Sequence, residues 1–351
     1  MNNSERDEMK ALVLHKMRDL RVEERPKPKP GPGQVLVRVR AVGLCGSDVH
    51  YYTHGRIGKQ VVTAPMIVGH EGAGEVAALG AGVDGLRTGE RIAIEPALSC
   101  GHCEFCITGK PNLCPRVKFC STPPIDGLMC EFAVLERHQC VPIPDEMTFD
   151  EAAMLEPLQV GAHANNLARV VTGETVAVVG AGCIGLACME VARAAGAGRI
   201  IITDKLDYRL RLAKKLGADE TLNIDRKDPV EEVERLTGGR MATLVFECTN
   251  RAAGAPQAWE LAGIGGRVIM VGIPEEDQIV LEAHESRRKE LLVQYVRRSR
   301  HAARQAIDLV TSRRVDVASW VTHRVPLARA KTAFDMVAEY KKGVLKAVIV
   351  P

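Results

Sequence analysis

Four cysteines lie close together between residues 100 and 114, in the stretch CGHCEFCITGKPNLC. They are Cys100, Cys103, Cys106 and Cys114, with the spacing C-x2-C-x2-C-x7-C. Four thiolates at such short separations can surround one tetrahedral zinc ion, and a shell of four protein ligands leaves no position open for substrate. The pattern therefore predicts a structural zinc site, while an iron–sulfur cluster or four unmetallated thiols are the alternatives that the residue types leave open.

A second set of metal-binding residue types lies upstream, in the strings GLCGSDVHYYTHGRIG and VGHEGAGEV. Cys45 offers a thiolate, His70 an imidazole and Glu71 a carboxylate. Three such ligands plus a water or substrate oxygen make a plausible catalytic zinc shell. Another carboxylate, that of Glu156, follows in LEPLQVG. Because Cys45 and His70 are far apart in sequence, the spacing alone is weaker evidence here than in the cysteine cluster.

A glycine motif for dinucleotide binding occurs in TVAVVGAGCIGLA, where Gly180, Gly182 and Gly185 form G-x-G-x-x-G. An apolar strand pattern precedes it and an amphipathic helix pattern follows, which is the context that the motif requires. The first glycine permits a tight turn, the second lets backbone approach a pyrophosphate, and the third allows close helix packing. We assign Ile184, within the same turn, to the cofactor site as well.

The residues after the next predicted strand indicate which dinucleotide binds. Asp204 ends the strand pattern RIIITD, where a carboxylate can accept hydrogen bonds from the adenosine ribose and would repel a 2′-phosphate. This favours NAD over NADP. Arg209 also belongs to the predicted cofactor site, and with Lys205 it places positive charge nearby that would soften this preference.

The elements that must position these residues form two patterns. Residues 10–95 read as short strands with alternating apolar residues, separated by Gly- and Pro-rich turns, which is typical of an antiparallel, barrel-like unit. From about residue 159, apolar strands alternate with helices, which predicts a parallel, doubly wound α/β sheet. We expect a nucleotide-binding domain over residues 159–299 and a catalytic domain made of residues 1–158 plus 300–351. Six strand patterns, from TVAVVG to LLVQYV, already complete the α/β unit, and the last segment ends in a further strand, GVLKAVIV.

Taken together, GLCGSDVHYY, GHEGAGEV, the cysteine lobe, EPLQVG, GAGCIG and VTHRVPL resemble the zinc-containing medium-chain dehydrogenases. The strings GRIG, VKFCSTPPIDG and VFECT are most similar to the sorbitol (polyol) dehydrogenase branch. The resemblance covers nearly the whole chain. It implies a Rossmann domain, a GroES-like β-barrel domain with a zinc lobe, and zinc-dependent oxidation of a polyol to a ketose with NAD. Alternatives are a threonine or simple secondary-alcohol dehydrogenase, or a non-catalytic zinc- and nucleotide-binding protein.

The resemblance also implies residue roles. Cys45, His70 and Glu71 would ligate a catalytic zinc, and Glu156 would contact it directly or through water. One thiolate and one carboxylate already neutralise Zn²⁺, so we expect only one of the carboxylates of Glu71 and Glu156 to bind the metal directly at any moment. Proton relay and substrate binding fall to a further set on matching positions: Ser47 and His50 for the relay, and Tyr51, Phe119 and Arg298 for the substrate.

One departure from the branch concerns the substrate pocket. A tyrosine usually follows the arginine that matches Arg298, and this sequence has Ser299 within the run Arg297–Arg298–Ser299–Arg300. A smaller residue enlarges the pocket, and the extra positive charge could admit an acidic or phosphorylated sugar derivative. Arg297 and Arg300 are equally compatible with a solvated or subunit-contacting face.

The bulk composition excludes other classes of function. The formal net charge is only +3 and aromatic residues make up 4%, which argues against a nucleic-acid surface. No apolar run approaches the ~20 residues of a membrane helix, and the polar start, MNNSERDEMK, predicts no signal peptide. We therefore expect a cytoplasmic protein whose partner is a small polyol, and the resemblance suggests a homotetramer.

Overall fold

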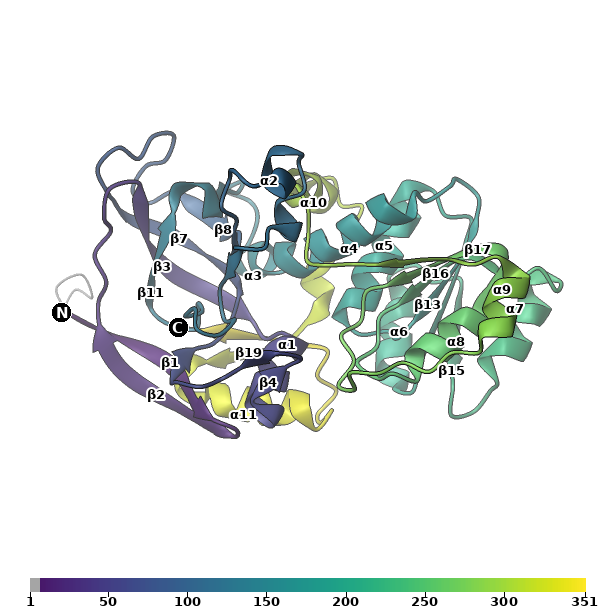
Figure 1. The fold of residues 1–351 in the computed structure, drawn as a ribbon. Helices are drawn as coiled ribbons and strands as arrows, with labels where there is room; N and C mark the ends of the chain where they lie inside the picture. Colours follow the sequence, from purple (N-terminus) through teal and green to yellow (C-terminus); the bar gives the residue numbers. More distant parts are fainter. Residues whose placement is uncertain (1–6) are drawn as a thin grey trace. The chain divides into compact units, whose positions relative to one another are not determined.

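The computed structural model describes residues 7–351 and divides into two compact units (Figure 1). Unit 1 comprises residues 1–156 and 317–351, of which 7–156 are described at the start, and unit 2 comprises residues 157–316. Among the described residues no helix is both long and apolar enough to cross a membrane.

Unit 1 is built on a seven-stranded sheet with the order β12-β8-β7-β3-β20-β19, and β11 pairs with β3 off this path. Its strands are β3 (Gln34–Gly43), β7 (Glu71–Leu79), β8 (Arg91–Ile94), β11 (Phe132–Glu136), β12 (Cys140–Pro142), β19 (Val321–Pro326) and β20 (Lys346–Val350). All of these pairs are antiparallel except β19 with β20. Two register shifts where β3 pairs with β7 allow β3 to bend, so that different parts of it meet β11 and β20.

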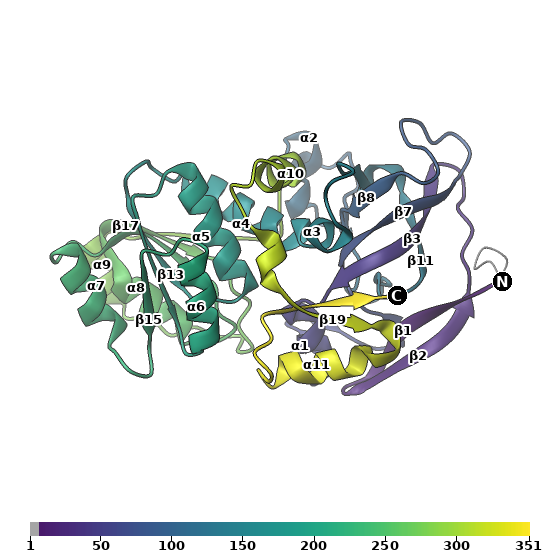
Figure 2. The same cartoon turned by 180° about the vertical axis from the view of Figure 1, so that it is seen from behind.

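The remaining elements of unit 1 are short strands, helices and turns around this sheet. The strands are β1 (Glu8–Lys16), β2 (Asp19–Pro26), β4 (Arg56–Ile57), β5 (Gln60–Val61), β6 (Met66–Ile67), β9 (Ala97–Leu98) and β10 (Lys118–Phe119). The helices are α1 (Gly46–His54), α2 (Glu104–Ile107), α3 (Phe149–Ala153) and α11 (Ala330–Ala338), with 3-10 turns η1 (Pro111–Leu113), η2 (Arg137–Gln139), η3 (Val317–Trp320) and η4 (Leu327–Arg329). In Figure 2, α1 lies beside α11, and the two helices pack together.

Unit 2 contains a six-stranded sheet whose pairs are all parallel, in the order β15-β14-β13-β16-β17-β18. The strands are β13 (Thr175–Val179), β14 (Arg199–Asp204), β15 (Glu220–Asn223), β16 (Ala242–Glu247), β17 (Ala262–Met270) and β18 (Leu292–Tyr295). The helices are α5 (Cys183–Ala195), α6 (Asp207–Lys215), α7 (Pro229–Thr237), α8 (Gly254–Leu261), α9 (Ala283–Lys289) and α10 (Ala303–Thr311), and α4 (Leu155–Ala168) leads into the unit. This is the doubly wound order that the strand and helix patterns predict.

Helices cover both faces of this parallel sheet. On β13, Ala177 and Val179 belong to a buried cluster with residues of α7 and α8. Val178 points the other way, toward Gly185 in α5. Figures 1 and 2 show the same division, with α7 and α8 on one face and α5 and α6 on the other. Burial on both faces explains why these strands are continuously apolar.

The structure differs from the sequence-based boundary at the end of unit 2. Residues 300–316, predicted to belong with the catalytic domain, lie in unit 2, because α10 and the segment after it bond to that unit. The Asn166 amide donates to the Gln305 amide oxygen at 2.9 Å, and the Asp316 N–H donates to the Glu190 carboxylate at 2.9 Å. Only the segment from Val317 onward returns to unit 1.

A buried histidine in α4 makes the stability of unit 2 sensitive to acid. His163 is 2% exposed, and its Nδ1 has no hydrogen-bond partner among the described residues. Burial, assisted by the charge of Arg300, lowers the pKa of His163 to about 4, from an ordinary value of 6.5. Between pH 6.5 and 4 the imidazole is therefore protonated in the unfolded chain but neutral in the folded chain. The free energy of unfolding falls as the pH is lowered through this range.

We expect His163→Gln to remove this acid sensitivity. Between pH 7.5 and 5, the free energy of unfolding of the unmodified protein should fall by about 1–2 kcal/mol more than that of the variant. Urea unfolding monitored at several pH values provides the measurement. Two parallel stability curves would show that His163 does not titrate as described.

Candidate active site and nucleotide site

Three predicted zinc ligands meet in unit 1. Suitable ligand atoms of Cys45, His70 and Glu71 all lie within 4.8 Å of one another. The register of the sheet explains this convergence, because Glu71 at the start of β7 pairs with Gly43 at the end of β3, and Cys45 follows two residues later as the N-cap of α1. His70 and Glu71 are buried and Cys45 is half-buried, so a thiol, an imidazole and a carboxylate meet at a site largely shielded from water. This donor set suits zinc.

The absence of a side chain at Gly43 in β3 leaves room for the Glu71 carboxylate. A Cβ added at Gly43 would lie 2.0 Å from Oε2 of Glu71 and 2.6 Å from the Met154 side chain. Any other residue at position 43 would therefore displace the Glu71 carboxylate. The same carboxylate accepts two hydrogen bonds from the buried Lys346 ammonium, at 2.7 and 2.8 Å.

An aspartate that the sequence analysis did not assign lies behind His70. Asp48 is fully buried, and its carboxylate lies 3.4 Å from Nδ1 of His70. It also accepts hydrogen bonds from the Ser121 hydroxyl at 2.7 Å and from the Gly69 N–H at 3.1 Å. Burial alone would raise the pKa of Asp48, but the facing His70 and the hydrogen bonds from the Ser121 hydroxyl and the Cys45 N–H lower the pKa below its ordinary value. A carboxylate in this position fixes the orientation of a metal-binding imidazole.

Replacing this aspartate tests its role. We expect Asp48→Asn to weaken zinc binding at the Cys45 site by roughly 10–100-fold, because the amide cannot supply the negative charge that orients His70. Zinc content after dialysis against a mild chelator measures the effect. As a control, Asp19→Asn removes a half-buried carboxylate that pairs with Arg21 outside the metal cluster, and it should leave the zinc content unchanged.

The carboxyl group of Glu156 is close enough to the cluster for its charge to matter. Burial raises the pKa of Glu156 to about 7, the negative charges of Glu71 and Glu95 add to this effect, and His70 and Lys346 oppose it. Glu156 is not among the three residues whose ligand atoms meet. A carboxyl group with a pKa near neutrality can hold or release a proton at physiological pH.

The four cysteines between residues 100 and 114 also converge. Their sulfur atoms lie within 4.8 Å of one another, with 3.5 Å between Cys103 and Cys106 and 3.9 Å between Cys100 and Cys106. Tetrahedral Zn–S bonds of about 2.3 Å require sulfur atoms about 3.8 Å apart, so the spacing fits. A hydrogen bond from the backbone at His102 lowers the pKa of the Cys100 thiol to about 5, and Arg116 lies 3.5 Å from its sulfur.

The glycine turn joins β13 to α5 in unit 2. Gly180 has φ +96°, which favours glycine, and a Cβ added at Gly185 would lie 1.8 Å from the Gly180 carbonyl oxygen. Gly182 is different, since a Cβ there would meet nothing closer than 3.8 Å and its backbone is extended. The fold therefore requires the first and third glycines, whereas the second leaves an open space at the N-terminus of α5, where a pyrophosphate can bind.

Asp204 ends β14 beside this turn. Its carboxylate accepts hydrogen bonds from the backbone N–H groups of Ala181 at 2.8 Å and Leu206 at 2.9 Å. Arg209 lies 3.7 Å from it, close enough for an ion pair. Ile184 is half-buried in the first turn of α5. The structure thus brings the predicted glycines, Asp204 and Arg209 to one edge of the parallel sheet.

The chain matches two family models. The first describes the alcohol dehydrogenase GroES-like domain and matches residues 31–145, and the second describes zinc-binding dehydrogenases and matches residues 183–312. The sorbitol dehydrogenase of Bacillus subtilis is 38% identical over 98% of this chain and 97% of its own length. The chain belongs to the zinc-containing medium-chain dehydrogenases, in the sorbitol dehydrogenase branch.

Solved structures of related dehydrogenases share the fold. A zinc-binding dehydrogenase from Sinorhizobium meliloti, bound to NADP, is 30% identical and superposes with a TM-score of 0.90 over 99% of this chain and 100% of its own. A short chain alcohol dehydrogenase from Escherichia coli, complexed with NADH, is 29% identical with a TM-score of 0.89 over 98% and 100%. These likenesses agree with the GroES-like and Rossmann units seen here.

The other predicted site residues of this dehydrogenase are distributed over both units. Ser47, His50 and Tyr51 lie on α1, directly after Cys45, and both His50 and Tyr51 are buried. Arg298 follows β18 in unit 2, with an unusual positive φ of 56°. The roles of these four residues remain predictions.

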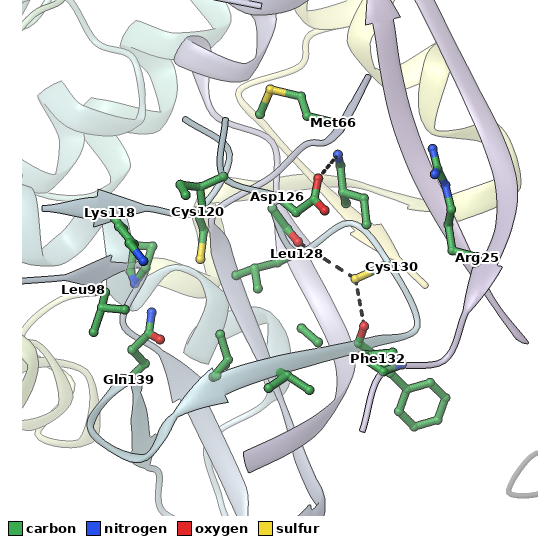
Figure 3. Close-up of a pocket in the computed structure, with 18 of the residues that line it drawn as sticks. Arg25, Met66, Leu98, Lys118, Cys120, Asp126, Leu128, Cys130, Phe132 and Gln139 are labelled. Carbon is green, nitrogen blue, oxygen red and sulfur yellow. Dashed lines mark hydrogen bonds between the residues drawn. The ribbon is translucent and has the colours of Figure 1, made fainter. Parts of the chain in front are cut away.

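Phe119 lies at the metal cluster of the dehydrogenase. Its ring centroid is 5.3 Å from that of His70. Phe119 and Cys120 also help to line a cavity of about 460 Å³, shown in Figure 3 with Lys118, Leu128 and Cys130. None of the three clustered zinc ligands lines this cavity, so it is not the metal site.

Proposed function

We propose that this dehydrogenase oxidises a secondary alcohol of a polyol to a ketose, using zinc at the Cys45 cluster and NAD at the glycine turn. The observation that carries the proposal is the convergence of Cys45, His70 and Glu71 in one buried site of a chain that also has a dinucleotide-binding turn. The sorbitol dehydrogenases, similar over almost their full length, support a polyol as the substrate class.

The bound groups would supply the chemistry, and the chain would supply the surroundings. Zinc provides Lewis acidity, which favours loss of a hydroxyl proton, and NAD provides the hydride acceptor. Cys45, His70 and Glu71 would hold the zinc, with Glu156 as a further carboxylate beside it. The N–H groups at the start of α5 would bind the pyrophosphate, and Asp204 would accept hydrogen bonds from the adenosine ribose and favour NAD over NADP.

The hydroxyl proton needs a route away from the buried site. Ser47 Oγ would receive it, and the His50 ring would pass it onward. His50 lies three positions after Ser47 on α1, so their side chains lie along the same side of the helix.

Substrate recognition would fall to three further side chains, those of Phe119, Tyr51 and Arg298. The ring of Phe119 packs on His70, where it can limit the volume beside the metal ligands. Tyr51 offers a phenol, and Arg298 offers a guanidinium that can hydrogen-bond several hydroxyls. Ser299 and the extra arginines, Arg297 and Arg300, leave room and positive charge for an acidic or phosphorylated polyol.

A substrate panel tests the proposal and its nearest alternative. NAD reduction is measured with sorbitol, xylitol, galactitol, threonine and 2-butanol, each at several concentrations. The highest kcat/KM is expected for one of the three polyols. Faster turnover of threonine or 2-butanol would assign the enzyme to another activity of the same superfamily, and no turnover at all would favour a non-catalytic binding protein.

We also propose that the protein assembles into a homotetramer. Its compartment would be a reducing one, such as the cytoplasm. Edge strand β18 exposes Leu292 and Tyr295 by 61% and 62%, and Ile264 and Val280 in the same unit are more than four-fifths exposed. An apolar edge of this kind favours pairing with a second copy. Light scattering should give the mass of a homotetramer, and a monomer would contradict this part of the proposal.

A further inference from the structure

Strand β20, in the segment that returns to unit 1, places a lysine beside the metal ligands. Lys346 begins β20 and is 4% exposed. Its ammonium donates to both carboxylate oxygens of Glu71, at 2.7 and 2.8 Å, and to the Leu44 carbonyl at 3.2 Å. These acceptors satisfy all three donors, which a buried ammonium needs in order to keep its charge.

The same carboxylate faces the site where a metal would bind. One oxygen of Glu71 belongs to the group of ligand atoms that lie within 4.8 Å of one another, together with those of Cys45 and His70. Glu71 is 1% exposed, and Gly43 leaves only enough space for the carboxylate where it now lies. With zinc bound at the cluster, Glu71 would therefore interact with two cations, the metal ion and the Lys346 ammonium.

Lys346 also changes the charge balance around the cluster. Negative charge around the cluster comes from the Cys45 thiolate and the carboxylates of Glu71, Glu156 and Asp48, the last of which faces His70 at 3.4 Å. A zinc ion with one thiolate and one carboxylate is neutral, so Lys346 adds one positive charge at a depth where water screens little. This charge opposes zinc binding, and it favours any negative charge that develops on the substrate oxygen.

We propose that Lys346 is a positioning residue that acts through Glu71: by pairing with this carboxylate, it weakens the hold on zinc and keeps the metal site more positive. The inference rests on the proposed function, because it assumes zinc at the Cys45 cluster. It assigns a role in the reaction to a residue that touches none of the reacting atoms.

The test compares Lys346→Met with Lys346→Arg and with the control Lys331→Met. Lys331 forms an ion pair with Asp335 at 2.8 Å on α11, outside the cluster. The exchangeable zinc is removed with dipicolinate, the zinc that remains is counted by mass spectrometry, and zinc is then titrated back. We expect Lys346→Met to bind zinc on the order of tenfold more tightly, since one repelling charge is gone. Lys346→Arg and Lys331→Met should behave like the unmodified protein.

Two further readouts separate this role from a purely structural one. Without zinc, Lys346→Met leaves Glu71 buried without a cation, so its melting temperature should fall, and added zinc should restore most of the loss. The acidic limb of kcat/KM should move to higher pH by roughly one unit, because the site is less positive. If Lys346→Met fails to fold, Lys346→Gln, which keeps a hydrogen-bond donor without the charge, takes its place.

Unchanged zinc affinity, or an equal loss of melting temperature with and without zinc, would overturn the inference. Either result would mean that Lys346 only stabilises the fold. If the unmodified protein binds no zinc beyond the ion in the four-cysteine lobe, the proposed function itself fails, which is a distinguishable outcome.

Discussion

Replacing Cys45 by serine is expected to lower kcat/KM for the polyol by at least about a thousandfold, because the metal's contribution of several kcal/mol to lowering the barrier is lost. Serine is a much poorer zinc ligand than a thiolate, and Cys45 is the only sulfur among the three clustered ligands. The variant should contain one zinc per chain in place of two. Affinity for NAD should be unchanged, since the glycine turn lies in unit 2.

Cys103→Ser is the matched control for this experiment. It removes a thiolate from the other metal cluster and should also lower the zinc content to one per chain, but with a different consequence. The lobe around residues 100–114 has exposed apolar side chains, such as Ile107 at 72%, and little core of its own. We expect this variant to lose stability first and activity only as a result. Full activity of Cys45→Ser would disprove the catalytic assignment.

The second large effect is expected at Gly182. An alanine there meets no atom of the protein within 3.8 Å and needs no unusual backbone, so Gly182→Ala should fold with an unchanged melting temperature. Its methyl group would occupy the space through which a pyrophosphate approaches the N-terminus of α5. We expect the Kd for NAD to rise by at least tenfold, or about 1.4 kcal/mol. Fluorescence titration with NADH measures it.

Gly185→Ala provides the contrast, because its added carbon would lie 1.8 Å from the Gly180 carbonyl oxygen. This variant should lose both stability and cofactor affinity. If Gly182→Ala binds NAD as tightly as the unmodified protein, the glycine turn is not the cofactor site.

Local patterns in the sequence could be interpreted reliably. The four cysteines are so close in sequence that a single short loop can bring them together, and the structure does bring their sulfur atoms together. The glycine motif is equally local, and the six strand patterns from Thr175 onward all correspond to strands of the parallel sheet. Periodicity and spacing carry this information because each element is formed by residues adjacent in sequence.

Contacts between distant segments could not be predicted in the same way. Lys346 meets Glu71 only because β20 pairs with β3, and no motif surrounds the lysine. Asp48 stands within a recognised string, but its role depends on His70, Ser121 and Gly69, which come from other segments. The end of unit 2 was placed too early, because the amphipathic pattern of α10 does not say which unit buries it.

The way the chain leaves unit 1 after Glu156 and comes back at Val317 has a consequence for biosynthesis. Unit 2 is continuous and can acquire its structure while the ribosome is still translating, whereas the earlier unit must wait for its last two strands. A product terminated prematurely near residue 316 would retain the nucleotide turn but lack the partner of Glu71. Such a fragment would keep all three clustered ligands, but its sheet would lack β20 and the lysine that pairs with Glu71.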